Sequence, residues 1–322
     1  MPSEIHKVDK SLYTIQDFRE WNPPPIRHII WEGVLDIGQK LQIFGNEGSW
    51  KSILALHLAY CLSSGHKWLG FRTSPANVIY IVGEGGKLSI RNRAIKYCNG
   101  TRTIYLAKPG DVPQELERAE ALASPDNVAM QYIDTLHLDG RTGGINILRD
   151  KVDKLIACSP ALPVVVIVDP LYKVVMRDLT VAREVSFLLE NLDCMLADYN
   201  SVRNGYQLQL AVVIVHHPRK ASIDKEGNKI FQGSDDSFGA KELSWWFDTV
   251  MNANLNEEDA TKTIVDVRFT KHGRDAEGYL PELIKVRWDK STLHPRILKR
   301  LIPKLPDDEL ELRGDTLLQS LE

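Results

Sequence analysis

Two stretches of this sequence contain uninterrupted apolar runs, PVVVIVDP at 163–170 and LAVVIVHH at 210–217. A strand with one face in water alternates apolar and polar residues, whereas a strand covered by helices on both faces does not. A helix-like segment at 181–199 lies between the two runs, as the connection between parallel strands requires. These features predict an α/β fold with a mostly parallel central sheet and helices on both faces.

The same alternation of strand-like and helix-like segments extends through most of the chain. Further strands are expected at 41–44, 77–82, 103–106 and 128–133, and further helices at 52–65, 87–98, 112–124 and 145–157. After residue 240 the pattern changes, and strand-like segments separated by turns follow at 245–255, 263–270 and 283–288. We expect these segments to extend the same sheet in an antiparallel manner.

The composition is that of an ordinary globular protein. The chain is 43% hydrophobic with a net charge of −3, so it is no uniformly basic nucleic-acid coat, and any contact with nucleic acid must be local. The polar N-terminus and the lack of a membrane-length apolar run predict a cytoplasmic protein without membrane contact. We expect residues 1–33 to form a proline-rich arm, 34–300 one α/β domain, and 301–322 an acidic C-terminal tail.

The strongest local motif is LQIFGNEGSWKS at 41–52, where a strand, a glycine-containing loop and the start of a helix follow one another. In this context the pattern indicates a phosphate-binding loop, whose backbone N–H groups hold phosphate oxygens at a helix N-terminus. Lys51 would reach the β- and γ-phosphates of ATP, and Ser52 would ligate Mg²⁺. The residues expected to contact the nucleotide are Gly45, Asn46, Glu47, Gly48, Ser49, Trp50, Lys51 and Ser52.

Trp50 departs from the usual pattern of such a loop, because it stands where the last glycine normally lies. We expect a bulky residue at this position to strain the turn or to crowd the nucleotide. The alternative is an accidental match on an ordinary strand–helix turn. The carboxylates that follow later in the chain argue against that alternative.

Two carboxylates follow expected strands, at the edge of a parallel sheet where ligands bind. Glu84 comes after the strand at 77–82, and Asp169 ends the apolar run of 163–170. Glu84 is suited to orient and deprotonate an attacking water. Asp169 is suited to support Mg²⁺. The alternatives are an exposed loop glutamate and a turn residue before Pro170.

Two histidines end the strand at 210–217, and a long polar loop follows them. One of His216 and His217 is a candidate sensor of the γ-phosphate, the alternative being a satisfied structural histidine. Long loops within compact domains are usually functional or disordered. We expect the loop at 218–243 either to contact DNA or to be a solvated charged loop. Its candidate DNA-binding residues are Arg219, Lys220, Lys225 and Lys229.

The segment FTKHGR at 269–274 places Lys271 and Arg274 on an expected turn between two strands. Cations on an exposed turn can stabilise transition-state charge at the nucleotide of a neighbouring subunit. An ordinary charged hairpin is the alternative interpretation. A zinc site is not indicated, because no cysteine or histidine cluster has the spacing of ligands.

The motifs GNEGSWKS, VIYIVGEGG, VVVIVDPL, AVVIVHHPRK, GSDDSFGAKELSWWFDTV and RFTKHGR occur in this order. With these motifs in this order, the chain resembles the RecA-like P-loop ATPases, and among them the plasmid RepA-like hexameric helicases. The resemblance covers about residues 25–290. It implies that Glu84 is the catalytic base and that His216 or His217 senses the phosphate. It further implies that the cations of FTKHGR act across a subunit interface.

The resemblance implies a protein that uses ATP and Mg²⁺ to move on single-stranded DNA. It would assemble as a ring, a hexamer in the manner of that group, with residues 34–300 as its RecA-like ATPase domain and replication proteins among its partners. Relatives accept aromatic residues before the P-loop lysine, which implies that Trp50 is compatible with nucleotide binding.

Two other functions are weighed against this one. The first is a RecA-like nucleotide-dependent accessory or loader, or a recombination-type ATPase, with slow hydrolysis and no unwinding, which Trp50 and the modest basic balance of the chain favour. The second is a small-molecule kinase, which the long strand followed by Glu84 argues against. The lack of a lid-like arginine cluster also argues against a kinase. Stimulation of ATP hydrolysis by single-stranded DNA distinguishes the motor from the accessory.

Overall fold

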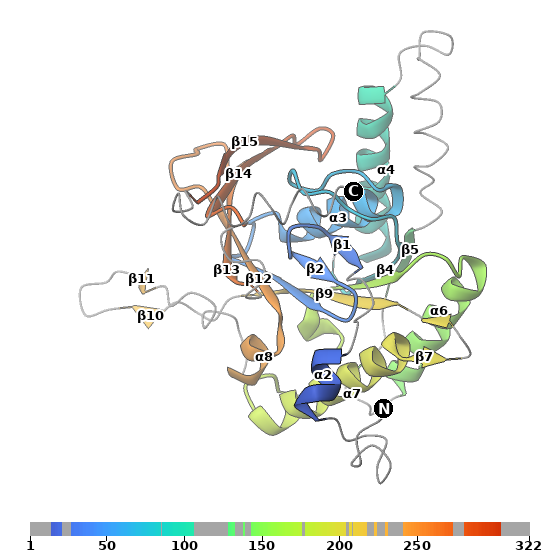
Figure 1. The fold of residues 1–322 in the computed structure, drawn as a ribbon. Coiled ribbons are helices and arrows are strands. Elements are labelled where there is room, and N and C mark those ends of the chain that lie inside the picture. Colours follow the sequence, from blue (N-terminus) through green and yellow to red (C-terminus); the bar gives the residue numbers. More distant parts are fainter. Residues whose placement is uncertain are drawn as a thin grey trace.

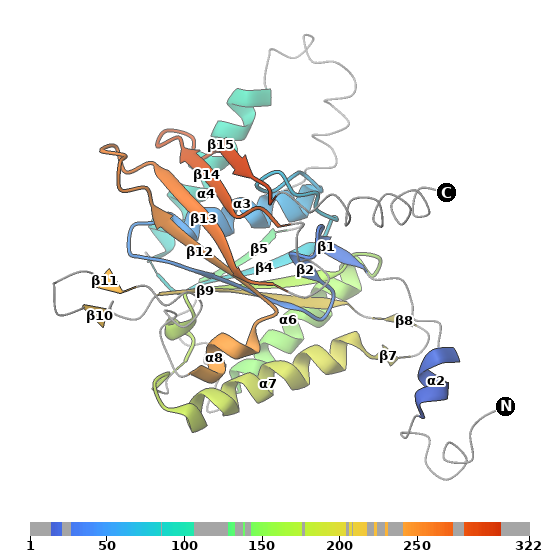
Figure 2. The ribbon, with the colours of Figure 1, turned by 60° about the vertical axis from the view of Figure 1, so that its left-hand side comes forward.

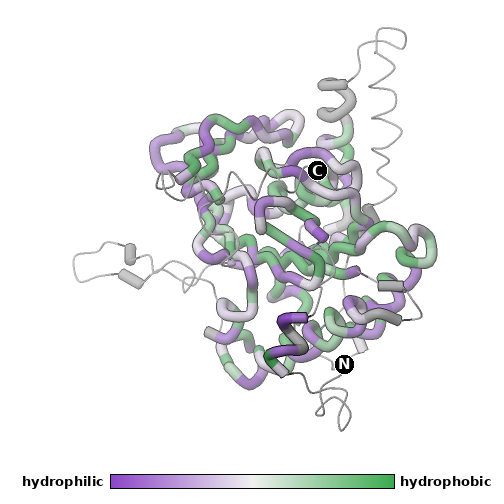
Figure 3. Tube along the Cα trace, viewed as in Figure 1, coloured by the Kyte–Doolittle hydropathy of each residue, from purple (hydrophilic) through white to green (hydrophobic). Residues whose placement is uncertain are grey.

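The computed structural model of the protein describes residues 14–20, 27–84, 86–105, 128–132, 138, 143–175, 178–203, 206–207, 209–217, 222–223, 229–230, 241–272 and 280–303. In these ranges the chain forms one nine-stranded sheet with helices on both of its faces (Figure 1). Apolar residues concentrate along the central strands, and polar residues occupy much of the periphery (Figure 3).

Six strands form the parallel part of the sheet. They are β3 (Lys40–Phe44), β4 (Asn77–Val82), β5 (Val128–Tyr132), β6 (Val164–Asp169), β9 (Leu210–His216) and β12 (Thr249–Leu255). Their order is β12-β3-β9-β6-β4-β5, and every neighbouring pair is parallel. The predicted α/β fold with a mostly parallel sheet is confirmed, and the two apolar runs form the adjacent strands β6 and β9.

Three antiparallel strands extend the sheet beyond β12, and the sequence predicted the first two of them. They are β13 (Ile264–Lys271), β14 (Leu283–Trp288) and β15 (Pro295–Leu301). Strand β15 was not predicted, because this mostly exposed edge strand does not alternate apolar and polar residues.

The start of this region differs from the prediction. Residues 245–246 were expected in a strand, but they end helix α8 (Lys241–Trp246). The Trp246 indole donates a hydrogen bond to Asp193 Oδ1 at 2.8 Å, so contact with the neighbouring helix outweighs the strand propensity of tryptophan. The strand that follows, β12, joins the sheet parallel to β3 rather than antiparallel.

Helices pack on both faces of the sheet (Figure 2). Helices α3 (Lys51–Ser64) and α4 (Gly86–Tyr105) cover one face, and α6 (Gly144–Cys158) and α7 (Ala182–Asn200) cover the other. Strand residues alternate accordingly, with Ile167 in the core on the α3 side and Val166 in the core on the α7 side. The strand predicted at 103–106 is wrong over 103–105, because α4 continues through these residues and context overrides their propensity.

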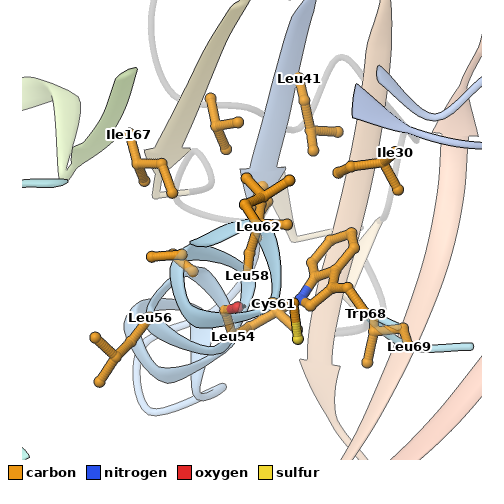
Figure 4. Close-up of a cluster of buried hydrophobic side chains, with 14 of the residues drawn as sticks. Ile30, Leu41, Leu54, Leu56, Leu58, Cys61, Leu62, Trp68, Leu69 and Ile167 are labelled. Atoms are coloured by element: carbon orange, nitrogen blue, oxygen red, sulfur yellow. Dashed lines mark hydrogen bonds between the residues drawn. The ribbon is translucent and has the colours of Figure 1, made fainter. Parts of the chain in front are cut away.

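Helix α3 is enclosed on several sides, which explains why it is apolar around most of its surface. Ten of its 14 residues are buried. Leu54, Leu58 and Leu62 share a core with Trp68 and with strand residues such as Leu41 (Figure 4). Strands β13 and β14 contribute to the same core. This packing fixes the N-terminus of α3, where the phosphate-loop motif ends.

The remaining short elements complete the described chain. They are α2 (Ile15–Glu20), β1 (His28–Ile30), β2 (Leu35–Asp36), η2 (Leu171–Lys173), β7 (Val202–Arg203), β8 (Tyr206–Gln207), β10 (Ser222–Ile223) and β11 (Lys229–Ile230). Strand β1 pairs with β2, and Ile29 and Ile30 lie buried in the core beside α3. Among the described helices, none has the length and apolar character needed to cross a membrane.

Some predictions fall outside the described residues. They are the helix at 112–124, the tail from residue 304 onward, and the side chains of Arg219, Lys220, Lys225, Lys229 and Arg274. Within the predicted loop of 218–243, the structure describes β10 and β11 as an antiparallel pair, followed by α8.

Candidate nucleotide-binding site

The loop between β3 and α3 is shaped by its neighbour in the sheet, β12. A Cβ atom on Gly45 would lie 1.8 Å from the carbonyl oxygen of Ala253, so only glycine fits this approach. The Asn46 N–H donates a hydrogen bond to Asn254 Oδ1 at 3.2 Å, and Ser49 Oγ donates to the Asn46 carbonyl at 2.7 Å. The loop is therefore folded back on itself and anchored to β12.

Trp50 adopts the left-handed conformation, with φ 64° and ψ 15°, directly before the first residue of α3. For a residue with a Cβ this conformation costs about 1–2 kcal/mol. Two contacts hold it in place. The indole stacks on Trp288 of β14 with centroids 5.9 Å apart and planes 2° apart, and its Nε1 donates to the Lys262 carbonyl at 3.0 Å. The antiparallel extension thus stabilises the turn that glycine usually makes.

Lys51 is buried inside this loop. Its ammonium donates a hydrogen bond to the Asn46 carbonyl at 2.6 Å and lies 3.4 Å from Ser49 Oγ. Burial lowers the pKa of Lys51 to about 8, and the nearby carboxylates, Asp169 foremost, partly oppose that shift. A desolvated ammonium among loop oxygens is suited to bind an incoming anion.

The second group of the site joins α3 to the tips of β4 and β6. Ser52 Oγ donates a hydrogen bond to Asp169 Oδ1 at 3.1 Å, and the Tyr80 hydroxyl donates to Asp169 Oδ2 at 2.6 Å. Burial raises the pKa of Asp169, and these two hydrogen bonds act in the opposite direction. The sequence singled out Ser52 and Asp169 but missed Tyr80. The clue to Tyr80 was its hydroxyl within the apolar run NVIYIV, because a buried hydroxyl needs a hydrogen-bond partner.

A third group lies beside these residues and contains Glu84, Tyr172 and His217. The Tyr172 hydroxyl donates a hydrogen bond to Glu84 Oε1, and the Tyr172 ring lies 5.5 Å from the His217 ring. His217 is half-buried, and burial together with the Lys51 charge lowers its pKa. Tyr172 was missed by sequence reasoning, because no spacing rule connects η2 with the end of β4. His216 is fully buried, and it is His217 that lies against Tyr172.

Backbone packing explains why Tyr172 reaches Glu84. The Gly83 N–H donates a hydrogen bond to the Asp169 carbonyl at 2.8 Å, which joins the end of β4 to the end of β6. A Cβ atom on Gly83 would lie 2.4 Å from Lys173 Cβ, so η2 packs directly on this glycine. This close approach fixes the position of Tyr172 in η2 relative to Glu84, which follows Gly83.

Lys271 lies away from these three groups. It is the last residue of β13, and its ammonium donates a hydrogen bond to the Trp245 carbonyl at 2.9 Å. Burial lowers the pKa of Lys271, with Asp248 opposing the shift and Lys40 adding to it. Lys40 begins β3, whereas the phosphate loop follows the end of that strand. In one chain, therefore, the structure does not bring Lys271 to the loop.

A mostly parallel sheet with a lysine–serine loop after one strand, and an aspartate at the tip of another, defines a RecA-like P-loop ATPase. The fold is similar to a solved structure described as an ATPase domain, with a TM-score of 0.54 and 17% identity over 81% of this chain and 85% of that one. It is also similar to a DnaB-like replicative helicase whose structure was described with its interactions with primase. That match has a TM-score of 0.58 and 16% identity over 91% of this chain and 68% of that one.

Residues 7–222 match the AAA domain family, and the chain belongs to this family. No curated protein was found that matches the chain by sequence. At 16–17% identity, the similarity to the solved structures is one of fold.

Proposed function

We propose that the protein is an ATP-dependent motor on single-stranded DNA that works as a ring, as a hexamer, in the manner of a replicative helicase. The observation that carries the proposal is the contact between Ser52 and Asp169 beside the buried ammonium of Lys51. In this proposal residues 34–300 are the ATPase domain, between an N-terminal arm (1–33) and an acidic tail (301–322). Replication proteins are proposed partners, in line with the DnaB-like relative described with primase.

ATP and Mg²⁺ fit the residues of the site. The loop from Gly45 to Ser52 would hold the phosphates through backbone N–H groups, with Lys51 adding a charge-assisted hydrogen bond. A hydroxyl and a carboxylate oxygen 3.1 Å apart, from Ser52 and Asp169, are ligands that suit Mg²⁺. Bound Mg²⁺ would neutralise charge that develops on the β- and γ-phosphates.

In this proposal Glu84 accepts the proton of the attacking water. Tyr172 holds the carboxylate through its hydroxyl, and the same ring contacts His217, which precedes the predicted DNA-binding loop. His217 is the proposed sensor of the γ-phosphate. The proposed DNA contacts are Arg219, Lys220, Lys225 and Lys229.

The position of Lys271 supports a shared site. Its ammonium lies near the start of β3, away from its own phosphate loop, which is consistent with a role at the loop of another copy. We propose that Lys271 and Arg274 of one subunit stabilise transition-state charge in the next, as arginine fingers do. A closed ring of identical subunits supplies one such contact to every site.

The test measures ATP hydrolysis with and without single-stranded DNA, and then in mixtures of wild-type and Lys271→Ala protein. We expect strong stimulation by DNA, and in mixtures a loss of activity greater than the mutant fraction. Lys290→Ala is the matched control, because the Lys290 ammonium also donates to a backbone carbonyl, that of Thr261 at 2.9 Å. Activity that falls only in proportion to the mutant fraction would contradict a shared site.

Trp50 favours a second function, that of an accessory or loader ATPase with slow hydrolysis. Its left-handed turn is locked by Trp288 and by Lys262, which restricts movement of the phosphate loop. ATP binding with slow hydrolysis that single-stranded DNA leaves unchanged would favour this function over the motor.

A further inference from the structure

The antiparallel extension has one face in the core and one face outside it. Val265 and Val267 of β13, and Ile284 and Val286 of β14, pack in the core beside α3. Because side chains alternate along a strand, the intervening residues lie on the opposite face. The register places Ile264 of β13 opposite Arg287 of β14, and Arg287 opposite Arg296 of β15. These three strands therefore share one continuous outer face.

This outer face is strongly basic. Its cations come from all three strands and are Arg268, Lys285, Arg287, Arg296 and Lys299. Four of them are exposed, and Lys285 is partly buried. The carboxylate among the strand residues of this face is Asp266. The whole chain carries 43 acidic and 40 basic residues, so five cations to one carboxylate is a marked local excess.

Two carboxylates near this face, Asp266 and Asp289, already have partners of their own. Asp266 accepts a hydrogen bond from Asn256 Nδ2 at 2.9 Å and lies 3.9 Å from the Lys285 ammonium. Asp289, just after β14, accepts hydrogen bonds from the backbone of Ser291 and Thr292. Among the described residues of this face, one ion pair forms, between Lys285 and Asp266. The arginines therefore repel one another with little local compensation.

The described helices do not cover this face. The hydrophobic core on the α7 side of the sheet extends as far as Val250 of β12. No described residue of β13, β14 or β15 belongs to this core. Helices α7 and α8 lie beneath the central strands, while β13 to β15 extend past them (Figure 2). The described outer-face residues of these strands include no aromatic side chain.

We propose that this basic face binds the phosphate backbone of duplex DNA. Arginine is the side chain best suited to phosphate, through its planar set of donors. Proteins that bind single strands use aromatic platforms on which bases stack, and the described residues of this face provide none. An array of cations without aromatic side chains instead matches contact with phosphates alone, which is independent of sequence. This duplex site is separate from the single-strand site proposed in the loop at 218–243.

The test compares wild-type protein with a variant carrying Arg268→Ala, Arg287→Ala and Arg296→Ala. Binding to a labelled duplex is followed by fluorescence anisotropy at several salt concentrations. We expect the slope of log K against log salt to become shallower by about 0.9 for each lost contact, or about 2.7 in total. The matched control removes three exposed cations outside the face, Lys96, Lys154 and Arg183, and should keep the wild-type slope.

Two further measurements separate this proposal from the proposed function. ATP hydrolysis without DNA should be unchanged in the face variant, which also shows that the variant is folded. Affinity for single-stranded DNA should fall by less than about 3-fold, because the loop that is proposed to hold the single strand is intact. An unchanged duplex slope, or an equal loss of single-strand and duplex binding, would overturn the duplex assignment. If wild-type protein hydrolyses ATP without stimulation by single-stranded DNA, the motor fails while the duplex measurement still stands.

Discussion

The phosphate loop and the group around Glu84 lie side by side but are held in different ways. Lys51 in the loop is 6% exposed and donates to loop oxygens, and Asp169 at the tip of β6 beside it is 3% exposed with two donors on its carboxylate. In the other group, Tyr172 is 37% exposed and Glu84 is half-buried. The part that would hold phosphate is built into the core, whereas the part that would activate water lies at the surface.

A chain of stacked rings explains the rigidity of the first region. Trp50 stacks on Trp288, Trp288 meets the edge of His57 at 6.1 Å, and the His57 ring lies 5.9 Å from that of Tyr97 in α4. Burial lowers the pKa of His57 to about 3, so this ring is neutral at physiological pH. The loop is thus tied through three aromatic contacts to the second helix on its face of the sheet. A preorganised charge site needs such support.

The largest expected effect is that of Glu84→Gln. The amide preserves the shape of the side chain but cannot accept the proton, so turnover should fall by about 10²–10⁴-fold. ATP affinity should change little, because Glu84 does not belong to the loop that holds the phosphates. Single-turnover hydrolysis and calorimetric ATP binding measure the two quantities. Unchanged hydrolysis would remove Glu84 from the role of base.

Trp288→Ala tests whether the aromatic contacts hold the loop. Removing a buried tryptophan should lower the free energy of unfolding by about 3–5 kcal/mol, and ATP affinity should fall with it because Trp50 loses its support. Urea denaturation and calorimetry measure these changes. Trp245→Ala is the control, since Trp245 is 67% exposed and should change stability by about 0.5 kcal/mol or less. Normal ATP affinity in folded Trp288→Ala protein would contradict the coupling.

Lys51→Met should weaken ATP binding and stabilise the free protein. Loss of a charge-assisted contact lowers binding by about 1.5–3 kcal/mol. The pKa of Lys51 is about 8 in the fold and 10.5 as its ordinary value, so between these pH values the unfolded chain holds the extra proton. Wild-type stability should therefore rise from pH 8 to pH 10.5, by up to about 3 kcal/mol.

Denaturation curves at about pH 7 and about pH 10, on either side of most of that rise, check this expectation. The Lys51→Met variant should lack the rise with pH, and at the lower pH it should be more stable than wild type. A variant less stable than wild type at the lower pH would show that the hydrogen bonds of Lys51 outweigh the cost of burying its charge.

The smallest effect is expected for Tyr172→Phe. Losing one hydrogen bond, worth about 1 kcal/mol, should lower kcat by about 5-fold and leave KM unchanged. The loss should disappear when Glu84 is already glutamine, because the hydroxyl acts through that carboxylate. Tyr199→Phe is the control, since it removes a comparable hydroxyl bonded to Asp153 at 2.7 Å, away from the site. A loss that persists in the Glu84→Gln background would assign Tyr172 another role.

The central fold could be predicted from sequence because burial on both faces of a parallel sheet leaves a visible pattern. The runs that became β6 and β9 could not have been half-exposed strands. The sequence pattern fails where packing against other elements decides whether a segment forms a helix or a strand. Edge strand β15 is largely exposed and shows no period, and residues 103–105 have the composition of a strand but continue α4.

The site was predictable to the extent that its residues follow strands. Lys51, Ser52 and Asp169 were expected at one edge of the sheet, and the structure places Ser52 and Asp169 in contact. Tyr80 and Tyr172 were missed, because their contacts depend on which strands are adjacent rather than on spacing along the chain. The left-handed turn at Trp50 also depends on a distant residue, Trp288, which a local motif cannot reveal.

The separation of Lys271 from its own phosphate loop would make the rate of ATP hydrolysis depend on protein concentration. If this lysine completes the site of a neighbouring copy, an isolated chain binds nucleotide but turns it over slowly. The rate per chain then rises with protein concentration and collapses on dilution, following mass action. The amount of protein in the cell would set the activity threshold, without any dedicated inhibitor. A plot of specific activity against concentration, from nanomolar to micromolar, would reveal that threshold.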